Sequence, residues 1–152
     1  MDIDYSDKGI YCLVFKNYSC EVKIGKLGNI SFKKGYHIYI GSALGSGGLK
    51  RVKRHISLSE NKDKKPRWHI DYLHLNHNFK LIATVCAATN ERYECLLAQK
   101  FIQKNNRVYI PNFGCSDCSC SSHLYYRKQY PMIEIKQFFI ESGLEPHLNH
   151  LD

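Results

Sequence analysis

Three segments in the first third of the chain have the residue patterns of β-strands. Residues 9–15 form a nearly continuous apolar run rich in β-branched and aromatic side chains, which is typical of a buried strand. Residues 20–24 alternate apolar and charged positions, and the turn residues at 26–29 lead into further apolar positions. This pattern predicts an antiparallel excursion of the chain, that is, two extended segments joined by a turn, inserted before the next strand. Residues 35–41 resume the strand pattern, and the small and glycine residues at 42–48 end it.

The rest of the chain mixes helical and extended patterns. Apolar residues recur at Leu49, Val52 and Ile56, which predicts a helix that docks through a narrow apolar stripe. The pattern then predicts, in order, a short helix at 68–75 with Trp68, Tyr72 and Leu75 inward, a buried strand at 79–87, a largely covered helix at 91–104, a short strand at 124–126 and an amphipathic helix at 131–143. These elements predict an α/β (α+β) fold, and the length of the chain favours a single domain that spans residues 1–152.

Composition and charge narrow the class of protein. With 43% apolar and 24% charged residues, the chain is globular rather than disordered. Twenty-two Lys and Arg against fourteen Asp and Glu give a net charge of +8, which favours a polyanion as partner, although other basic proteins share such an excess. The sequence contains no apolar run of the length that a bilayer requires and no leader pattern, so we expect a cytoplasmic protein with no membrane partner.

The cysteines argue against a secreted scaffold. Seven is an odd number, and Cys12, Cys20, Cys86 and Cys95 lie in apolar segments, as free buried cysteines usually do. A domain stapled by disulfides is therefore not expected.

Four side chains that could carry chemistry are brought together by the predicted elements. Tyr11 and Tyr39 belong to separate glycine-flanked strands, while Arg51 and His55 stand four residues apart on one face of the following helix, which we expect toward the sheet edge. A guanidinium there can hold a phosphate through two hydrogen bonds, an imidazole can carry a proton, and a phenol can position or activate water. Each residue taken alone is more often structural.

Two tripeptides, with several later blocks, make the combination specific. Gly9-Ile10-Tyr11 and Tyr39-Ile40-Gly41, followed by a glycine-rich loop and Arg51, resemble the two signature elements of the GIY-YIG nuclease superfamily. The chain is more closely similar to the Uri-type branch of that superfamily at residues 39–49, 54–55, 68–73, 116–120 and 123–124. The resemblance covers about residues 9–125.

The resemblance implies a small mixed, mainly antiparallel sheet flanked by helices, and metal-dependent hydrolysis of a nucleic-acid phosphodiester with Mg²⁺ or Mn²⁺. It implies that Tyr11 is the general base or the phenol that positions water, that Tyr39 is its partner at the attacking water, and that Arg51 clamps the scissile phosphate. His55 would assist proton transfer or hold the phosphate. Because an unperturbed tyrosine, with a pKa near 10, is a poor base at neutral pH, we expect Arg51 or a metal-bound water nearby.

Two positions depart from the superfamily pattern. The stretch between Tyr11 and Tyr39 is longer than the short hairpin of the superfamily. The metal-binding glutamate of the superfamily falls on a later helix that admits two registers here, one placing Glu94 and the other Gln99 at the ligand position. An amide is a much poorer ligand than a carboxylate for a hard dication, so the second register would leave Glu94 or Asp71 as the divalent-metal candidates.

Three further groups are candidates for binding. His69 and Asp71 stand two apart, so on a helix only one of them is expected near the cleft, while Asp71 has the alternative of capping the helix or pairing with nearby cations. Cys118, Cys120 and His123, with Cys115 as a fourth ligand or a distant His, are candidates for zinc, although structural zinc sites usually spread their ligands over two separate knuckles. The candidates for phosphate contacts are Lys50, Lys53, Arg54 and His69, together with the basic loop at 62–67.

The expected function is that of an endonuclease acting on DNA in preference to RNA, in repair or processing. The alternatives are a non-catalytic nucleic-acid-binding module of the same fold and a zinc-stabilised interaction protein. The sequence carries no base-recognition motif and no signal for the oligomeric state.

Overall fold

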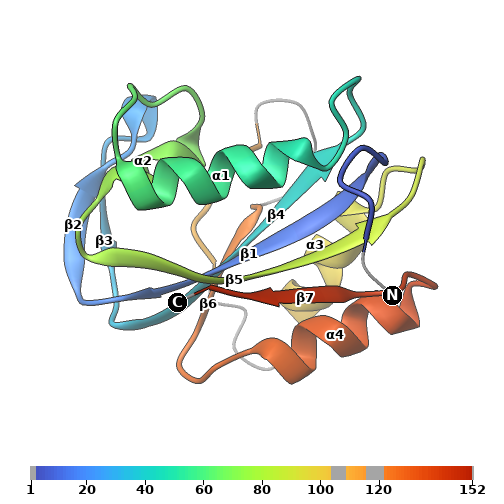
Figure 1. The fold of residues 1–152 in the computed structure, drawn as a ribbon. Helices are drawn as coiled ribbons and strands as arrows, with labels where there is room; N and C mark the ends of the chain where they lie inside the picture. Colours follow the sequence, from blue (N-terminus) through green and yellow to red (C-terminus); the bar gives the residue numbers. More distant parts are fainter. Residues whose placement is uncertain (1–2, 104–108, 116–121, 152) are drawn as a thin grey trace.

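The apolar segment nearest the start of the chain becomes the central strand of the molecule. In the computed structural model, which describes residues 3–103, 109–115 and 122–151, β1 (Gly9–Asn17) pairs antiparallel with both β4 (Gly35–Ala43) and β5 (Phe79–Ala88). The strands β6 (Leu124–Arg127) and β7 (His147–His150) add antiparallel edges, so the described residues form a five-stranded sheet in the order β6-β4-β1-β5-β7 (Figure 1).

Helices cover both faces of this sheet, which explains why β1 is apolar at almost every position. Helices α1 (Lys50–Asn61) and α2 (His69–Leu75) lie on one face, and α3 (Glu94–Gln103) and α4 (Met132–Glu141) lie on the other (Figure 1). Tyr11 and Leu13 belong to the core under α1 and α2, whereas Ile10 and Cys12 belong to the core over α3 and α4. The expected sheet flanked by helices, mainly antiparallel, is confirmed.

The longer stretch between the two tyrosines forms a separate hairpin. Strands β2 (Cys20–Lys23) and β3 (Asn29–Phe32) pair antiparallel, and the 3₁₀ helix η1 (Gly25–Leu27) joins them. The excursion leaves the pairing of β1 with β4 unbroken from Gly9 to Asn17. The two tyrosines therefore stay on adjacent strands.

The structure corrects three of the sequence-based expectations. Trp68, Tyr72 and Leu75 are only half-buried, although Trp68 and Tyr72 pack against the core, and the fully buried apolar side chains of α2 are Ile70 and Leu73. The helix packs against both α1 and β5, so the face that it buries is set by these two neighbours.

The second and third corrections concern β7 and Cys95. Strand β7 was not expected, because its sequence His-Leu-Asn-His is polar, as an exposed edge strand tolerates. Cys95 is disulfide-bonded rather than a free thiol, while Cys12 and Cys86 are buried free thiols as expected, and Cys20 is a half-buried free thiol. No helix among the described ranges combines the length and apolar character needed to cross a membrane.

The glycines of the two signature tripeptides allow close approach between elements. A Cβ at Gly9 would meet the carbonyl oxygen of Ala87 on the neighbouring β5, and a Cβ at Gly41 would meet the ring of Tyr11. Gly41 is also the register partner of Tyr11. The ring of Tyr11 therefore lies flat across β4 only because position 41 has no side chain.

Replacing Gly41 by alanine is expected to destabilise the protein by about 1–3 kcal/mol, because the new methyl group overlaps the buried Tyr11 ring and must displace it. Gly47→Ala is the matched control, since a Cβ there meets no atom within 4 Å and its effect should stay within about 1 kcal/mol. Urea unfolding followed by circular dichroism measures both. Equal stability of the two variants would contradict the assignment.

Candidate active site

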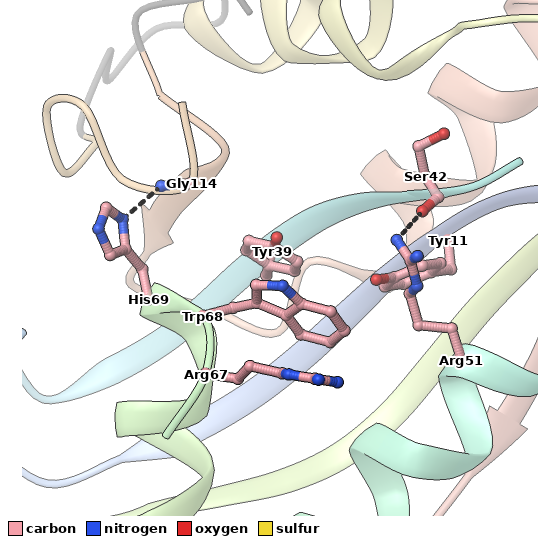
Figure 2. A pocket seen from close by; sticks show the side chains of 8 residues that line it. All are labelled: Tyr11, Tyr39, Ser42, Arg51, Arg67, Trp68, His69 and Gly114. Carbon is pink, nitrogen blue, oxygen red and sulfur yellow. Dashed lines mark hydrogen bonds between the residues drawn. The ribbon is translucent and has the colours of Figure 1, made fainter. Parts of the chain in front are cut away.

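Tyr11 and Tyr39 lie on the same face of the sheet and line one cavity. Tyr11 pairs with Gly41 and Leu13 pairs with Tyr39, so the two phenols are diagonal neighbours across β1 and β4. Tyr11 is only 2% exposed, while Tyr39 is half-buried. The cavity has a volume of about 240 Å³, and its lining also includes Arg51, Trp68, Ser42, Arg67, His69 and Gly114. Figure 2 shows these side chains together with the two tyrosines.

Arg51 reaches this cavity from the first turn of α1. Its Nη1 donates a hydrogen bond to the carbonyl oxygen of Ser42 at 2.8 Å, which fixes the guanidinium over the end of β4 (Figure 2). The residue is exposed and lines the cavity together with the tyrosines, and a guanidinium carries five N–H donors, of which this bond uses one. The site therefore offers a positioned cation with further hydrogen-bond donors.

Both phenols are neutral at physiological pH in the resting protein. Burial raises the pKa of Tyr11 well above its usual range, the neighbouring Tyr39 adds to the rise, and the Arg51 guanidinium opposes it. Burial likewise raises the pKa of Tyr39, with Arg51 again acting in the opposite direction. Arg51 is thus the cation that makes either phenolate less unfavourable.

Tyr11 is hydrogen-bonded to a buried pair of histidines. Its hydroxyl lies 2.9 Å from His55 Nε2, and His55 Nδ1 lies 2.9 Å from His74 Nε2. Burial lowers the pKa of His55 well below its usual range, helped by His74, and burial lowers the pKa of His74 to about 3. Both imidazoles are therefore neutral, so each has one N–H donor and one acceptor nitrogen.

The unpartnered nitrogen of His74 indicates in which direction the hydrogen bonds from His74 through His55 to Tyr11 are donated. His74 Nδ1 is buried and has no hydrogen-bond partner among the described residues. An orphaned buried N–H is rarer than an orphaned acceptor, so we assign the proton of His74 to Nε2, which then donates to His55. His55 in turn donates from Nε2 to the Tyr11 oxygen. The Tyr11 hydroxyl proton is left to point toward the cavity.

Glu94, the first residue of α3, belongs to an adjoining cavity of about 270 Å³. That cavity shares Tyr39, Ser42, Arg51 and Gly114 with the first, so the two form one cleft. Glu94 Oε2 is buried and has no hydrogen-bond partner within the described part of the chain. Gln99 is exposed on the same helix and lines neither cavity. Of the two residues that the sequence left open, Glu94 is therefore the one that shares a cavity with Tyr39 and Arg51.

Asp71 is engaged in structural contacts. It is fully buried, and its two carboxylate oxygens accept hydrogen bonds from Arg54 at 3.2 and 3.1 Å. One of them also accepts the backbone N–H groups of Arg67 and Trp68, so Asp71 caps the start of α2. Burial acts to raise the pKa of Asp71, but these bonds outweigh it and the pKa lies below its usual value. Asp71 therefore caps the helix and forms an ion pair, which is the alternative that the sequence allowed for it.

A cluster of His55, Asp71 and His74 brings three ligand-type atoms within 4.8 Å of one another. Its groups are already committed to each other and to neighbours, because Asp71 is bonded to Arg54 and both ring nitrogens of His55 are hydrogen-bonded. A cation there would also face the Arg54 guanidinium. The cluster is therefore a hydrogen-bonded network, whereas Glu94 has a buried carboxylate oxygen without a partner among the described residues.

The predicted phosphate-binding residues differ in their availability. Lys50 and Lys53 are exposed on α1, and Lys53 Nζ lies 5.0 Å from the centre of the Tyr5 ring. Arg54 is paired with Asp71 and lies 4.3 Å from the centre of the Trp68 ring. His69 lines the cavity wall, where its Nδ1 accepts the Gly114 N–H at 2.9 Å and burial lowers its pKa. Neutral His69 therefore carries its proton on Nε2.

The zinc candidates are only partly described. Cys118 and Cys120 lie outside the described residues. His123 is buried on β4's side of the cleft with Nδ1 3.1 Å from the carbonyl oxygen of Ile40, so this nitrogen carries the proton and is not a metal ligand. Cys115 is a free thiol whose Sγ donates to the Phe113 carbonyl oxygen at 3.4 Å.

Sequence reasoning did not assign a role at this site to His74, Arg92 or Trp68. His74 lies in an apolar helical stretch, where a histidine usually fills the core. Arg92 lines the Glu94 cavity, and its only signal is that it precedes Glu94 by two positions. Trp68 was expected to pack inward, and it does pack against the core while half-buried, but two guanidinium groups also contact its ring, with Arg51 5.2 Å and Arg54 4.3 Å from the ring centre.

Asp71→Asn is expected to lower the free energy of unfolding by about 1–3 kcal/mol at pH 7, because charge-assisted hydrogen bonds to a buried group are removed. The pKa of Asp71 is lowered in the folded state, so its carboxylate stabilises the protein above the unfolded pKa near 4, and this contribution disappears as the pH falls through the folded value. The difference from wild type should therefore narrow below about pH 4 in urea titrations.

The exposed Asp63 in the preceding loop provides the control, and Asp63→Asn should change stability by less than about 0.5 kcal/mol. A difference between Asp71→Asn and wild type that stays constant from pH 7 to pH 3 would count against the assigned charge network.

Comparison with known proteins yields one family. A family model described as domain of unknown function DUF123 matches residues 10–143, a range that lacks only the first residue of β1 and the strand β7 among the strands and helices just described. No curated protein and no solved structure matches the chain. Because the matched region covers most of the sequence, the chain belongs to the DUF123 family.

Proposed function

We propose that this protein is a metal-dependent endonuclease that hydrolyses phosphodiester bonds, with DNA preferred over RNA as the substrate. The observation that carries the proposal is the single cleft in which two phenols, one positioned guanidinium and one carboxylate with an unpartnered oxygen converge from four separate elements. Such a set matches the needs of phosphodiester hydrolysis, which are a bound phosphate, an oriented water and a site for a cation.

We also infer that the family is related to the GIY-YIG nucleases, and to their Uri-type branch in particular. The supporting observation is that each signature residue has a distinct physical task. Gly9 and Gly41 allow close packing of neighbouring groups, and Tyr11 and Tyr39 present their phenols to the cleft. These tasks explain why the same residues occur together, and they support the inferred relationship.

Arg51 is the group that would hold the scissile phosphate. The guanidinium lies at the boundary between the two halves of the cleft and is fixed by Ser42, so little side-chain entropy is given up when an anion binds. In the transition state it would also stabilise the negative charge that gathers on the phosphate oxygens.

Tyr11 would accept the proton from the attacking water. As the new bond forms between the water oxygen and phosphorus, the bond from phosphorus to the leaving oxygen breaks, and solvent returns a proton to that oxygen. The phenolate needed for this step is disfavoured by burial and favoured by Arg51 and by the hydrogen bond from His55. Tyr39 would orient the same water from the adjacent strand.

Glu94 would hold the divalent cation, Mg²⁺ or Mn²⁺. A buried carboxylate oxygen without a hydrogen-bond partner in the described ranges is suited to a hard cation, and Glu94 brings it to the edge of the cleft from the first turn of α3. When bound, the cation supplies positive charge next to the phosphate and so makes both phosphate binding and proton loss from water easier.

A non-catalytic nucleic-acid-binding module is the second candidate function. The observation that favours it is the strongly raised pKa of both Tyr11 and Tyr39, because neutral phenols hold a phosphate by hydrogen bonds but are poor bases. The two functions differ in what the removal of Arg51 changes.

Arg51→Ala is expected to lower the rate of DNA cleavage by about 100-fold or more, because the cation that stabilises the transition state is removed. Arg51→Lys should restore only part of the rate, since an ammonium cannot form the two-pronged contact. Nicking of supercoiled and branched DNA with Mg²⁺ or Mn²⁺ measures the rates. Because Arg51 is exposed, the midpoint of thermal unfolding should stay unchanged. Wild-type protein that binds but never cuts would leave the binding module as the function.

Glu94→Gln is expected to abolish the response of cleavage to Mn²⁺ or to shift it to much higher concentrations, because an amide replaces the metal-binding carboxylate. Titration of the protein with Mn²⁺ by calorimetry should show the same fall in affinity without any substrate. Gln99→Ala on the exposed face of the same helix serves as the control and should behave as wild type. Metal binding that survives Glu94→Gln intact would exclude this ligand.

A further inference from the structure

A second cavity lies at the other end of the central strands. Its volume is about 660 Å³, against about 240 Å³ for the cavity at the tyrosines. The lining comes from the end of β1, the starts of β4 and β5, the residues next to these strand ends and the segment after β6. We call it the lysine groove, and the argument below uses its residues Lys16, Tyr18, Lys34, Lys80 and Lys128.

The charges of the lysine groove are uncompensated. Lys16 on β1 is the direct register partner of Lys80 on β5, an arrangement of like charges that destabilises an antiparallel pair. The residues that line the groove include no Asp or Glu, and none of its lysines belongs to an ion pair formed within the described ranges. A bound anion would relieve this repulsion.

The groove is separate from the candidate active site. Lys16 lies five positions after Tyr11 on β1, which corresponds to about 17 Å of extended strand. Phe15 packs in the core under α1 and α2, and because side chains alternate along a strand, Lys16 points to the opposite face of the sheet. No residue lines both the groove and the cavity at the tyrosines.

The backbone around the groove is held in place by polar contacts. Asn17 Nδ2 donates to the carbonyl oxygens of Tyr18 at 3.0 Å and Lys33 at 2.9 Å, and Tyr18 N–H donates to the Asn78 carbonyl oxygen at 3.1 Å. The Tyr126 hydroxyl donates to the Lys34 carbonyl oxygen at 2.8 Å. Tyr18 nevertheless leaves 69% of its surface exposed. An exposed aromatic ring on a fixed backbone is a ready stacking surface.

We propose that the lysine groove binds single-stranded nucleic acid, with phosphates on the lysines and a base stacked on Tyr18. Lysines around a hollow track a phosphate backbone, and aromatic rings accept the face of any unpaired base. The exposed ring favours single strands over duplexes, because bases within a duplex are already stacked on one another, and over acidic peptides, which have no base to stack. This binding does not depend on the cleavage proposed above.

The test is fluorescence anisotropy of a labelled oligothymidylate in EDTA, so that no cleavage occurs. The variant Lys34→Ala/Lys128→Ala should bind on the order of tenfold more weakly, and the slope of log affinity against log salt should fall by about 1.4, or about 0.7 for each phosphate that is no longer neutralised. The control Lys26→Ala/Lys136→Ala removes the same charge from other positions on the surface and should bind as wild type. Tyr18→Ala should weaken binding by about tenfold with little change in slope.

The variant Lys80→Gln tests whether the groove lysines bind nucleic acid or only keep the protein soluble. It should raise the midpoint of thermal unfolding, because it removes the repulsion with Lys16, and at the same time weaken oligothymidylate binding. Equal weakening in the groove and control variants, or no binding by wild type, would overturn the proposal. So would tighter groove-dependent binding of a DNA duplex or of polyglutamate than of the single strand. The nicking assay on the same variants reports on the cleft independently, so failure of either proposal leaves the other measurable.

Discussion

The hydrogen bond between Tyr11 and His55 joins the sheet to the first helix, and the arrangement of the cleft depends on it. The bond forms because Gly41 leaves room for the Tyr11 ring to lie across β4 and because α1 places the buried imidazole of His55 within hydrogen-bond distance of the Tyr11 hydroxyl. The same helix places Arg51 one turn earlier, so one contact between α1 and the sheet sets the positions of the phenol, the imidazole and the guanidinium together. Any change that moves α1 relative to β1 would disperse all three.

Burial and charge are divided around this contact. The side facing the core holds neutral histidines and tyrosines, whose pKa values are shifted away from ionisation by burial. The side facing the cleft holds the fixed cation Arg51 and the carboxylate Glu94. Asp71 pairs with Arg54 and caps α2, so the second arginine of α1 joins the two helices instead of standing free in the cleft. Arg54 is thus occupied by its ion pair with Asp71, whereas Arg51 and Glu94 line the cleft.

The sequence was sufficient where a local pattern determines the outcome. The apolar run at the centre of β1, the glycines beside both tyrosines and the four-residue spacing of Arg51 and His55 all follow from strand and helix periodicity. The inward face of α2 was predicted wrongly because its orientation depends on packing against β5. The choice between Glu94 and Gln99 required the tertiary position of α3, and the pair formed by His55 and His74 required two helices to meet. The single-domain organisation stays a prediction.

The lysine groove is a second feature that local sequence patterns could not predict. Its lysines stand far apart in the chain and become neighbours only through the register of three strands and the segment after β6. A count of basic residues therefore indicates a polyanionic partner without indicating where it binds. The hairpin of β2 and β3, which looked like an interruption between the two tyrosines, instead leads the chain past Tyr18 and back to Lys34 at the edge of this groove.

The central place of β1 has a consequence for biosynthesis. Its partner β5 begins at Phe79, roughly 60 residues after β1 ends at Asn17. At a ribosomal rate of about 5–20 residues per second, one edge of this apolar strand stays unpaired for roughly 3–12 s during translation. Throughout that interval the nascent polypeptide carries an apolar strand with an open hydrogen-bonding edge that pairing with β4 does not cover, so the arrival of β5 is the step that protects the new molecule from edge-to-edge aggregation.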